Sequence, residues 1–272
     1  MDRAESSKSP ADPVDEPGVG NSSLSVAELV AALRREGELL AAALGRAELN
    51  AAVPGCPGWT MRDLVRHVGG VHRWATTYVV GCRQSAMAPE EKKALMATWP
   101  EDELLVAWFR AGHRSLVQAL EHAEPQLSCR TFLPASSPLA FWARRQAHET
   151  GIHRADAEAV AGPVSPFPVA VAVDGIEEML FGFASGKRRL RVDSIRKLRL
   201  SPTDSEVEWL VSLGPDGVEA TGLPRSDGDC RAAAPASSLF LMLWNRHPPD
   251  DVEVSGDPQL IDLWSESMKV RW

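Results

Sequence analysis

Cysteine is scarce in this 272-residue chain, and its four cysteines, Cys56, Cys82, Cys129 and Cys230, are scattered without a C-x-x-C pair. This spacing excludes a zinc finger and does not form a disulfide framework, so we expect reduced thiols and a cytoplasmic location. Long apolar runs are also missing: no stretch approaches about 18 residues, which excludes a transmembrane helix. Because no basic region followed by an apolar one opens the sequence, we expect no secretory signal.

Basic charge is in deficit as well. The chain has 29 Lys and Arg against 37 Asp and Glu, which gives a net charge of −8 with neutral histidines. Nucleic-acid-binding proteins usually carry a basic excess, and anionic membrane surfaces repel a negative chain, so we expect neither partner. Residues 187–199 form a local basic cluster. It is typical of a solvated loop and a protected edge strand, although it could attract an anion, and its role stays open.

Several common catalytic motifs are missing. The sequence contains no G-x-G-x-x-G and no G-x-S-x-G, which excludes the usual dinucleotide fingerprint and the nucleophile elbow of the α/β-hydrolases. Residues 182–188 (GFASGKR) only superficially resemble a P-loop. Their spacing is wrong, and Arg188 stands where a Ser or Thr would hold magnesium.

The first part of the chain is predicted to be helical after a disordered tail. Residues 1–22 are rich in Ser, Pro, Asp, Glu and Gly and cannot bury enough apolar surface to order themselves. Capping signals at Ser25 and Thr60, a Pro in the first turn of a later helix, and apolar periodicity predict four long helices. They cover 26–47, 60–82, 101–122 and 137–161, with a loop containing Pro89 before the third. A four-helix bundle over 23–163 follows.

A proline-rich segment at 163–168 marks a predicted domain boundary. Beyond it, residues 170–272 alternate between short β-type runs and helical patterns, which predicts a small α+β domain. The expected strands are 197–200, 209–213, 218–220, 229–233 and 252–254, and the expected helices are 170–185, 237–246 and 258–268.

Two candidate metal ligands lie on the fourth helix. Glu149 and His153 are four residues apart, so both side chains leave one face and can reach the same divalent ion. His148 points about 100° away. The commoner explanation of such a pair is a solvated contact within a helix.

A third candidate, His67, lies on the second helix in a stripe with Gly70, Val71, Trp74 and Tyr78. The two adjacent glycines, at positions 69 and 70, each cost about 1 kcal/mol of helix propensity, which suggests close approach of a helix or a ligand. The alternative is a core histidine at a packed crossing. His72 lies well round the helix and is a poor partner. Two histidines and one glutamate on facing helices would leave metal positions open, as in catalytic sites.

Five segments occur in order along the chain: 56–60 (CPGWT), 63–67 (DLVRH), 148–156 (HETGIHRAD), 243–246 (LWNR) and 254–258 (VSGDP). Together they resemble the mycothiol-dependent maleylpyruvate isomerase family of actinobacteria, from about residue 24 to the end. The resemblance implies a DinB-like four-helix bundle followed by a sterol-carrier-like α+β domain.

The resemblance also implies a divalent metal, usually zinc, held by His67, Glu149 and His153. In that family's chemistry the metal lowers the pKa of the mycothiol sulfur, and the thiolate adds to a cis double bond, allows rotation and leaves. The family's arginine from the second domain corresponds best to Arg246, which could hold a substrate carboxylate or steady an enolate. A helix-capping role for Arg246 is an equal alternative.

We therefore expect a cytoplasmic, monomeric enzyme that takes a low-molecular-weight thiol, mycothiol, and a small electrophile of open identity. One alternative is a mycothiol S-transferase, which keeps the thiol attached to another electrophile; a second is a non-catalytic metal-binding protein. Cys56 precedes a proline and has no base in sequence, so we interpret it as structural. The remaining aromatic candidates, Trp59, Trp74 and Trp142, are interpreted as core, with one pocket wall among them.

Overall fold

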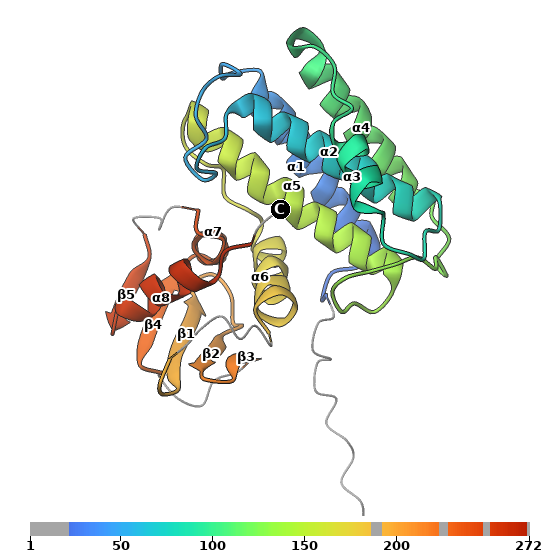
Figure 1. Cartoon of the computed structure of the whole chain (residues 1–272). Coiled ribbons are helices and arrows are strands. Elements are labelled where there is room, and N and C mark those ends of the chain that lie inside the picture. The colour runs from blue at the N-terminus through green and yellow to red at the C-terminus, as the bar shows by residue number, and fades with distance from the viewer. Residues whose placement is uncertain (1–21, 186–191, 223–227, 247–250, 271–272) are drawn as a thin grey trace, which may run out of the picture.

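The computed structural model describes residues 22–185, 192–222, 228–246 and 251–270. The predicted tail, apart from its last residue, and positions 187–191 of the basic cluster lie outside this part. Figure 1 shows a bundle of long helices beside a smaller sheet domain, with helix α6 between them. This arrangement confirms the predicted fold class of a helical bundle followed by an α+β domain. Within the described residues, no helix is long and apolar enough to cross a membrane.

The bundle consists of α1 (Val26–Leu44), α2 (Met61–Val80), α4 (Leu105–Glu121) and α5 (Pro138–Ala161). Full capping boxes start α1 at Ser25 and α2 at Thr60, because each side chain accepts from the backbone three residues on and the acidic partner reciprocates. α1 and α2 end at Leu44 and Val80, each followed by a glycine, two or three residues before the predicted ends. The third helix begins with a 3₁₀ turn, η1 (Asp102–Leu104).

The segment predicted as a loop around Pro89 contains a further helix, α3 (Pro89–Met96). The proline occupies the first turn, and Glu90 and Glu91 follow it at the positive end of the helix dipole. None of its residues is fully buried. The loop prediction was wrong because a two-turn surface helix needs no wide apolar stripe, and an apolar stripe is the signal on which sequence reasoning depends.

Helix α5 is buried along most of its length, and its buried residues include charged ones on several faces. The bundle helices pack on one side, while α6 (Val169–Glu177) contacts it on another, where Arg144 Nε lies 3.0 Å from Asp174 Oδ2. Buried polar groups are almost always paired. A helix with this composition therefore carries networks of ion pairs, and the candidate site is one of them.

The second domain is a five-stranded sheet of order β3-β2-β1-β4-β5. Its strands are β1 (Arg196–Pro202), β2 (Trp209–Gly214), β3 (Gly217–Gly222), β4 (Cys230–Ala234) and β5 (Glu253–Gly256). Among these strands of the described residues, β1 and β4 pair in parallel and the other neighbours pair antiparallel.

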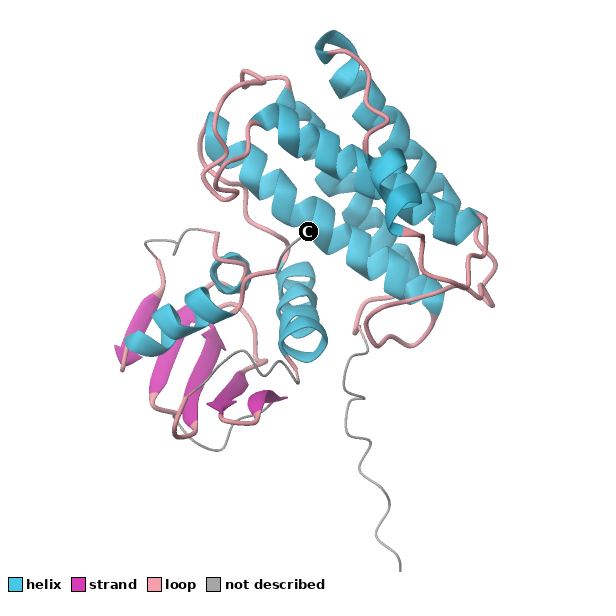
Figure 2. Cartoon of the chain, in the orientation of Figure 1, coloured by secondary structure: helices cyan, strands magenta, loops and turns pink. Residues whose placement is uncertain are grey.

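Three helical segments accompany the sheet (Figure 2): α7 (Ala236–Leu243), α8 (Gln259–Ser267) and α6. All five predicted strands and the three predicted helices of this domain are present. The helix expected over 170–185 changes at its middle, because α6 continues as a π-helical segment, η2 (Glu178–Ala184).

Candidate metal centre

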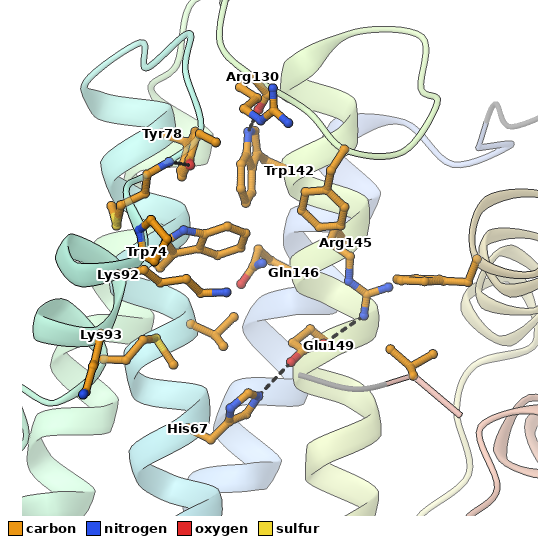
Figure 3. Close-up of a pocket in the computed structure, with 18 residues that line it drawn as sticks. His67, Trp74, Tyr78, Lys92, Lys93, Arg130, Trp142, Arg145, Gln146 and Glu149 are labelled. Atoms are coloured by element: carbon orange, nitrogen blue, oxygen red, sulfur yellow. Dashed lines mark hydrogen bonds and ion pairs between the residues drawn. The ribbon is translucent and has the colours of Figure 1, made fainter. Parts of the chain in front are cut away.

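Three predicted ligands converge between α2 and α5. His67 Nε2 lies 3.2 Å from Glu149 Oε1, and His153 Nε2 lies 3.4 Å from the same oxygen. One ligand atom from each residue falls within 4.8 Å of the other two. Figure 3 shows the His67 ring pointing at the carboxylate from the facing helix. Two imidazoles and one carboxylate, brought together and largely buried, are a donor set that suits a divalent ion such as zinc.

The adjacent glycines serve helix packing. A Cβ at Gly69 would come within 2.0 Å of the Trp108 ring on α4, and one at Gly70 within 2.9 Å of the Met96 side chain on α3. Of the two readings of these glycines, the close approach of other helices is therefore confirmed. The approach fixes α2 against its neighbours and so fixes where His67 points.

A carboxylate orients His153 from the side away from Glu149. His153 Nδ1 lies 2.9 Å from Asp156 Oδ2, so Nδ1–H donates to Asp156 and Nε2 faces the cluster. A carboxylate on the second imidazole nitrogen is the usual way to fix the tautomer of a metal-binding histidine. Sequence reasoning missed Asp156, although its position three residues after His153 on one helix was a usable signal.

Arg246 reaches this carboxylate from the other domain. Its Nε lies 2.7 Å from Asp156 Oδ1 and its Nη2 lies 3.1 Å from Oδ2. The preceding residue, Asn245, has a left-handed backbone at φ +58° and turns the chain toward the bundle just after α7. Arg246 therefore lies close to the candidate ligands, where it pairs with the carboxylate that contacts Nδ1 of His153.

Cys56 lies in the same network. Its thiol is 3.3 Å from Asp156 Oδ2, with Arg246 Nη2 at 3.5 Å, and together with His153 and Asp156 it forms a second set of ligand atoms within 4.8 Å. The interpretation of Cys56 as a cysteine without a nearby base was wrong, because the contact joins positions 100 residues apart. Arg246 contacts both oxygens of Asp156 and the Cys56 thiol, whereas Arg145 contacts Oε2 of Glu149 and leaves Oε1 facing the two histidines. The second set is therefore less suited to a cation than the first.

Arg145 is a further residue that sequence reasoning missed. It lies one turn before Glu149 on α5, and its Nη2 is 3.1 Å from Glu149 Oε2. The guanidinium also pairs with Glu178 and is only 2% exposed. Because Arg145 holds one oxygen of Glu149, the other oxygen is left facing the two histidines.

Burial and pairing shift the pKa values of all three candidate ligands. Burial lowers the pKa of His67 despite the neighbouring carboxylate. Burial alone would raise the pKa of Glu149, but hydrogen bonds to His153 and His67 outweigh it and hold that pKa below its ordinary value. For His153, burial is outweighed by hydrogen bonds to Asp156, Cys56 and Glu149, which raise its pKa well above the ordinary value. These shifts favour an ionised Glu149 beside a protonated His153. A metal ion would replace the proton between these two side chains.

The two other histidines near the motifs lie outside the cluster, as their spacing predicted. His72 Nε2 is 2.9 Å from Thr150 Oγ1, in the interior of the bundle. His148 Nε2 is 2.7 Å from Asp174 Oδ2, at the contact with α6.

A cavity of about 720 Å³ opens onto the cluster and includes His67 and Glu149 in its wall. Trp74 and Trp142 line it, which confirms that predicted tryptophans form one pocket wall. A second hollow of about 560 Å³ lies on the Arg246 side. It is lined by Cys56, Trp59 and Arg246 and by none of the three candidate ligands. Of these two cavities, the first therefore reaches the ligand atoms.

Comparison with known families decides the classification. The family model of the mycothiol maleylpyruvate isomerase N-terminal domain matches residues 30–158, and the model of the C-terminal domain of the same family matches residues 170–263. The chain belongs to the mycothiol-dependent maleylpyruvate isomerase family. The resemblance drawn from the sequence segments is thereby confirmed, and with it the assignment to an enzyme family.

Solved structures agree at the level of the fold. The chain is similar to crystal structures of the mycothiol-dependent maleylpyruvate isomerase and of its histidine-to-alanine variant, with TM-scores of 0.59 and 0.61. Each match has 15% sequence identity and covers 86% of this chain and 95% of the other. Comparison with curated protein sequences gave no match.

Proposed function

We propose that the chain is a metal-dependent enzyme that uses mycothiol to isomerise an activated cis double bond in a small molecule. The observation that carries this proposal is the convergence of His67, Glu149 and His153 at the wall of the cavity. Membership of the family supplies the reaction class. The centre is complete within one chain, which supports a monomer.

The residues present fit a zinc ion. Two imidazole nitrogens and one carboxylate oxygen lie within reach of one another, and Asp156 holds the outer nitrogen of His153. When bound, the metal would supply Lewis acidity that lowers the pKa of a thiol. With three protein ligands, the metal would keep room for the sulfur of that thiol.

The surrounding charges keep the ligands in place. Arg145 holds one oxygen of Glu149, and Asp156 holds the proton on Nδ1 of His153. Arg246 fixes Asp156 in turn and so acts as a positioning residue across the domain boundary. This account gives Arg246 a definite role without requiring it to touch the substrate.

A second candidate is thiol transfer, in which the thiol stays attached to the electrophile. The cavity volume of about 720 Å³ supports this alternative, because a site of this size can retain a conjugate. The two reactions differ in their product, which carries sulfur only in the transferase.

The test is turnover of maleylpyruvate by the zinc-loaded chain with and without mycothiol, followed by proton NMR. We expect thiol-dependent conversion of cis to trans protons with the mycothiol recovered unchanged. Consumption of mycothiol with a sulfur-linked product would establish the transferase. No turnover of maleylpyruvate or other cis-enones at any thiol concentration would contradict both reactions.

A further inference from the structure

The cavity follows the groove between α2 and α5 and has two chemically different ends. On α2 the lining residues run from His67 through Val71 and Trp74 to Tyr78, eleven residues later. At 1.5 Å per residue, the groove is about 16 Å long. Figure 3 shows His67 and Glu149 at one end and Tyr78 with Trp142 at the other. In the proposed reaction, mycothiol and the substrate share this length.

The end far from the ligands is built from aromatic ring faces. The Trp142 ring stacks on Tyr78 with centroids 5.0 Å apart and meets Trp74 edge-on at 5.1 Å. The polar atoms of two of these rings are already used: Tyr78 Oη accepts from Met87 N at 2.8 Å, and Trp142 Nε1 donates to the Arg130 carbonyl at 3.2 Å. Trp142 and Tyr78 are almost completely buried, so the surface left for a ligand at this end comes mainly from Trp74 and Phe132, and it is apolar.

The middle of the groove is polar. Gln146 is 1% exposed, and its Oε1 has no hydrogen-bond partner among the described residues. Figure 3 shows its amide and the ammonium of Lys92 pointing into the cavity from opposite walls. Lys92 Nζ lies 5.0 Å from the centroid of the Trp74 ring. Leaving a buried polar atom unsatisfied costs about 1–3 kcal/mol, so the Gln146 amide gains if it rotates and a ligand group pairs with it.

We propose that the cavity takes an aryl enone: a cis double bond conjugated to a ketone that carries an aromatic ring. The inference rests on the proposed function, which places the double bond at the metal end. The ring then lies against Trp74, and the ketone oxygen accepts from Lys92 and from the NH₂ group of Gln146. This placement requires the Gln146 amide to be rotated so that its NH₂ group, and not its oxygen, faces the ketone.

This placement also suits the charge that the reaction creates. When the thiolate adds, the new sulfur–carbon bond forms at the β-carbon, and the electron pair of the double bond moves to the ketone oxygen. After rotation about the resulting single bond, the pair returns, the sulfur–carbon bond breaks and the thiolate leaves. No oxidant is needed. The ammonium of Lys92 lines the cavity, and we assign to it the oxygen that carries this transient charge.

The test compares two unreactive ligands that differ only in the ring. 4-Oxo-4-phenylbutanoate carries a phenyl ketone, and 4-oxopentanoate carries a methyl ketone with the same carboxylate. Binding to the zinc-loaded full chain is measured calorimetrically without thiol, so no turnover interferes. We expect the phenyl ligand to bind at least tenfold more tightly. Trp74→Leu is expected to bring the two affinities close together.

Two lysine variants separate the subsites. Lys92→Met is expected to weaken both ligands several-fold and leave their ratio unchanged, because the ketone is common to both. Lys197→Met, an exposed lysine on β1, removes the same charge from a distant surface and is expected to change neither affinity. Circular dichroism of each variant verifies folding.

Equal affinity of the phenyl and methyl ligands for the parent chain would overturn the inference. So would 4-oxododecanoate binding as tightly as the phenyl ligand, since that result assigns the far end to an alkyl chain. These outcomes are distinct from failure of the proposed function. A chain that prefers the phenyl ligand but shows no thiol-dependent turnover would retain the subsite and lose the reaction.

Discussion

Arg246 Nε lies 2.7 Å from Asp156 Oδ1, so a residue of the sheet domain is one carboxylate away from the imidazole of His153. This contact explains why a bundle that already contains three candidate ligands is followed by a second domain. The buried Asp156 contacts His153 on one side. On the side that faces the sheet domain, the guanidinium of Arg246 supplies its positive partner. The sheet domain thereby helps to set the orientation of a ligand in the bundle.

The first prediction concerns the ligands. His67→Ala, Glu149→Ala and His153→Ala should each remove most of the zinc, because loss of one of three protein ligands leaves too few donors. His72→Ala and His148→Ala are matched controls, since both side chains lie outside the cluster. Elemental analysis of the purified proteins measures the zinc per chain. Full occupancy in all three ligand variants would refute the assignment.

The second prediction concerns the orienting carboxylate. Asp156→Asn should weaken zinc binding about 10–100-fold, because the amide cannot hold the Nδ1 proton of His153 as a carboxylate does. Competition with a fluorescent chelator gives the affinity. Unchanged affinity would show that Asp156 only bridges the domains.

The role of Arg246 follows from the same measurement. Arg246→Lys keeps a charge but loses the two-point contact, and we expect weaker zinc binding that is not additive with Asp156→Asn. The rival role, direct contact with substrate, predicts full zinc affinity and a loss of about 10²–10³ in turnover. A double-mutant cycle on zinc affinity and on kcat separates these two roles.

Sequence alone predicted most of the fold and the three candidate ligands. Those predictions depended on local patterns: capping residues, four-residue spacing on a helix and β-type alternation. Helix α3 was missed because it is polar and short, and such a helix forms against α2 without an apolar stripe of its own.

The outer part of the site could not be predicted in this way. Cys56 and Asp156 are 100 residues apart, and Arg246 is 90 residues beyond Asp156. The first contact depends on how the loop before α2 packs on α5, and the second depends on how the two domains dock; no local spacing encodes either. Arg145 lies within one turn of Glu149, but a helical arginine four residues from a glutamate is commonly a surface pair. Its burial became evident only with the docking of η2, which supplies Glu178.

The third prediction separates Cys56 from the metal ligands. Cys56→Ala should retain about one zinc per chain, because its thiol lies on the Nδ1 side of His153, next to Asp156 and Arg246. Elemental analysis again gives the metal content, and Cys82→Ala, which removes an exposed thiol, is the control. Loss of zinc from Cys56→Ala alone would show that the thiol belongs to the ligand set.

The fourth prediction concerns acid stability. Burial lowers the pKa of His113 from 6.5 to about 4, so the unfolded chain binds this proton at a higher pH than the folded chain does. The free energy of unfolding should therefore fall as pH drops from about 6.5 to 4, by about 1.4 kcal/mol per pH unit for this group. His72, whose pKa is also held well below 6.5 by burial, acts in the same direction.

Urea unfolding at several pH values tests this expectation. His113→Phe keeps the ring contact with Phe109 but removes the titrating group, so its stability should depend less steeply on pH. An identical slope in the variant and the parent chain would show that His113 does not contribute.

The central claim is that the three ligands hold a metal with a position open to an exogenous thiol. The most direct measurement is the absorption spectrum of the cobalt-substituted chain during titration with mycothiol. We expect a sulfur-to-cobalt charge-transfer band that saturates at one thiol per metal and is lost in Glu149→Ala. An unchanged spectrum at saturating mycothiol would contradict the account and indicate a centre that activates water instead.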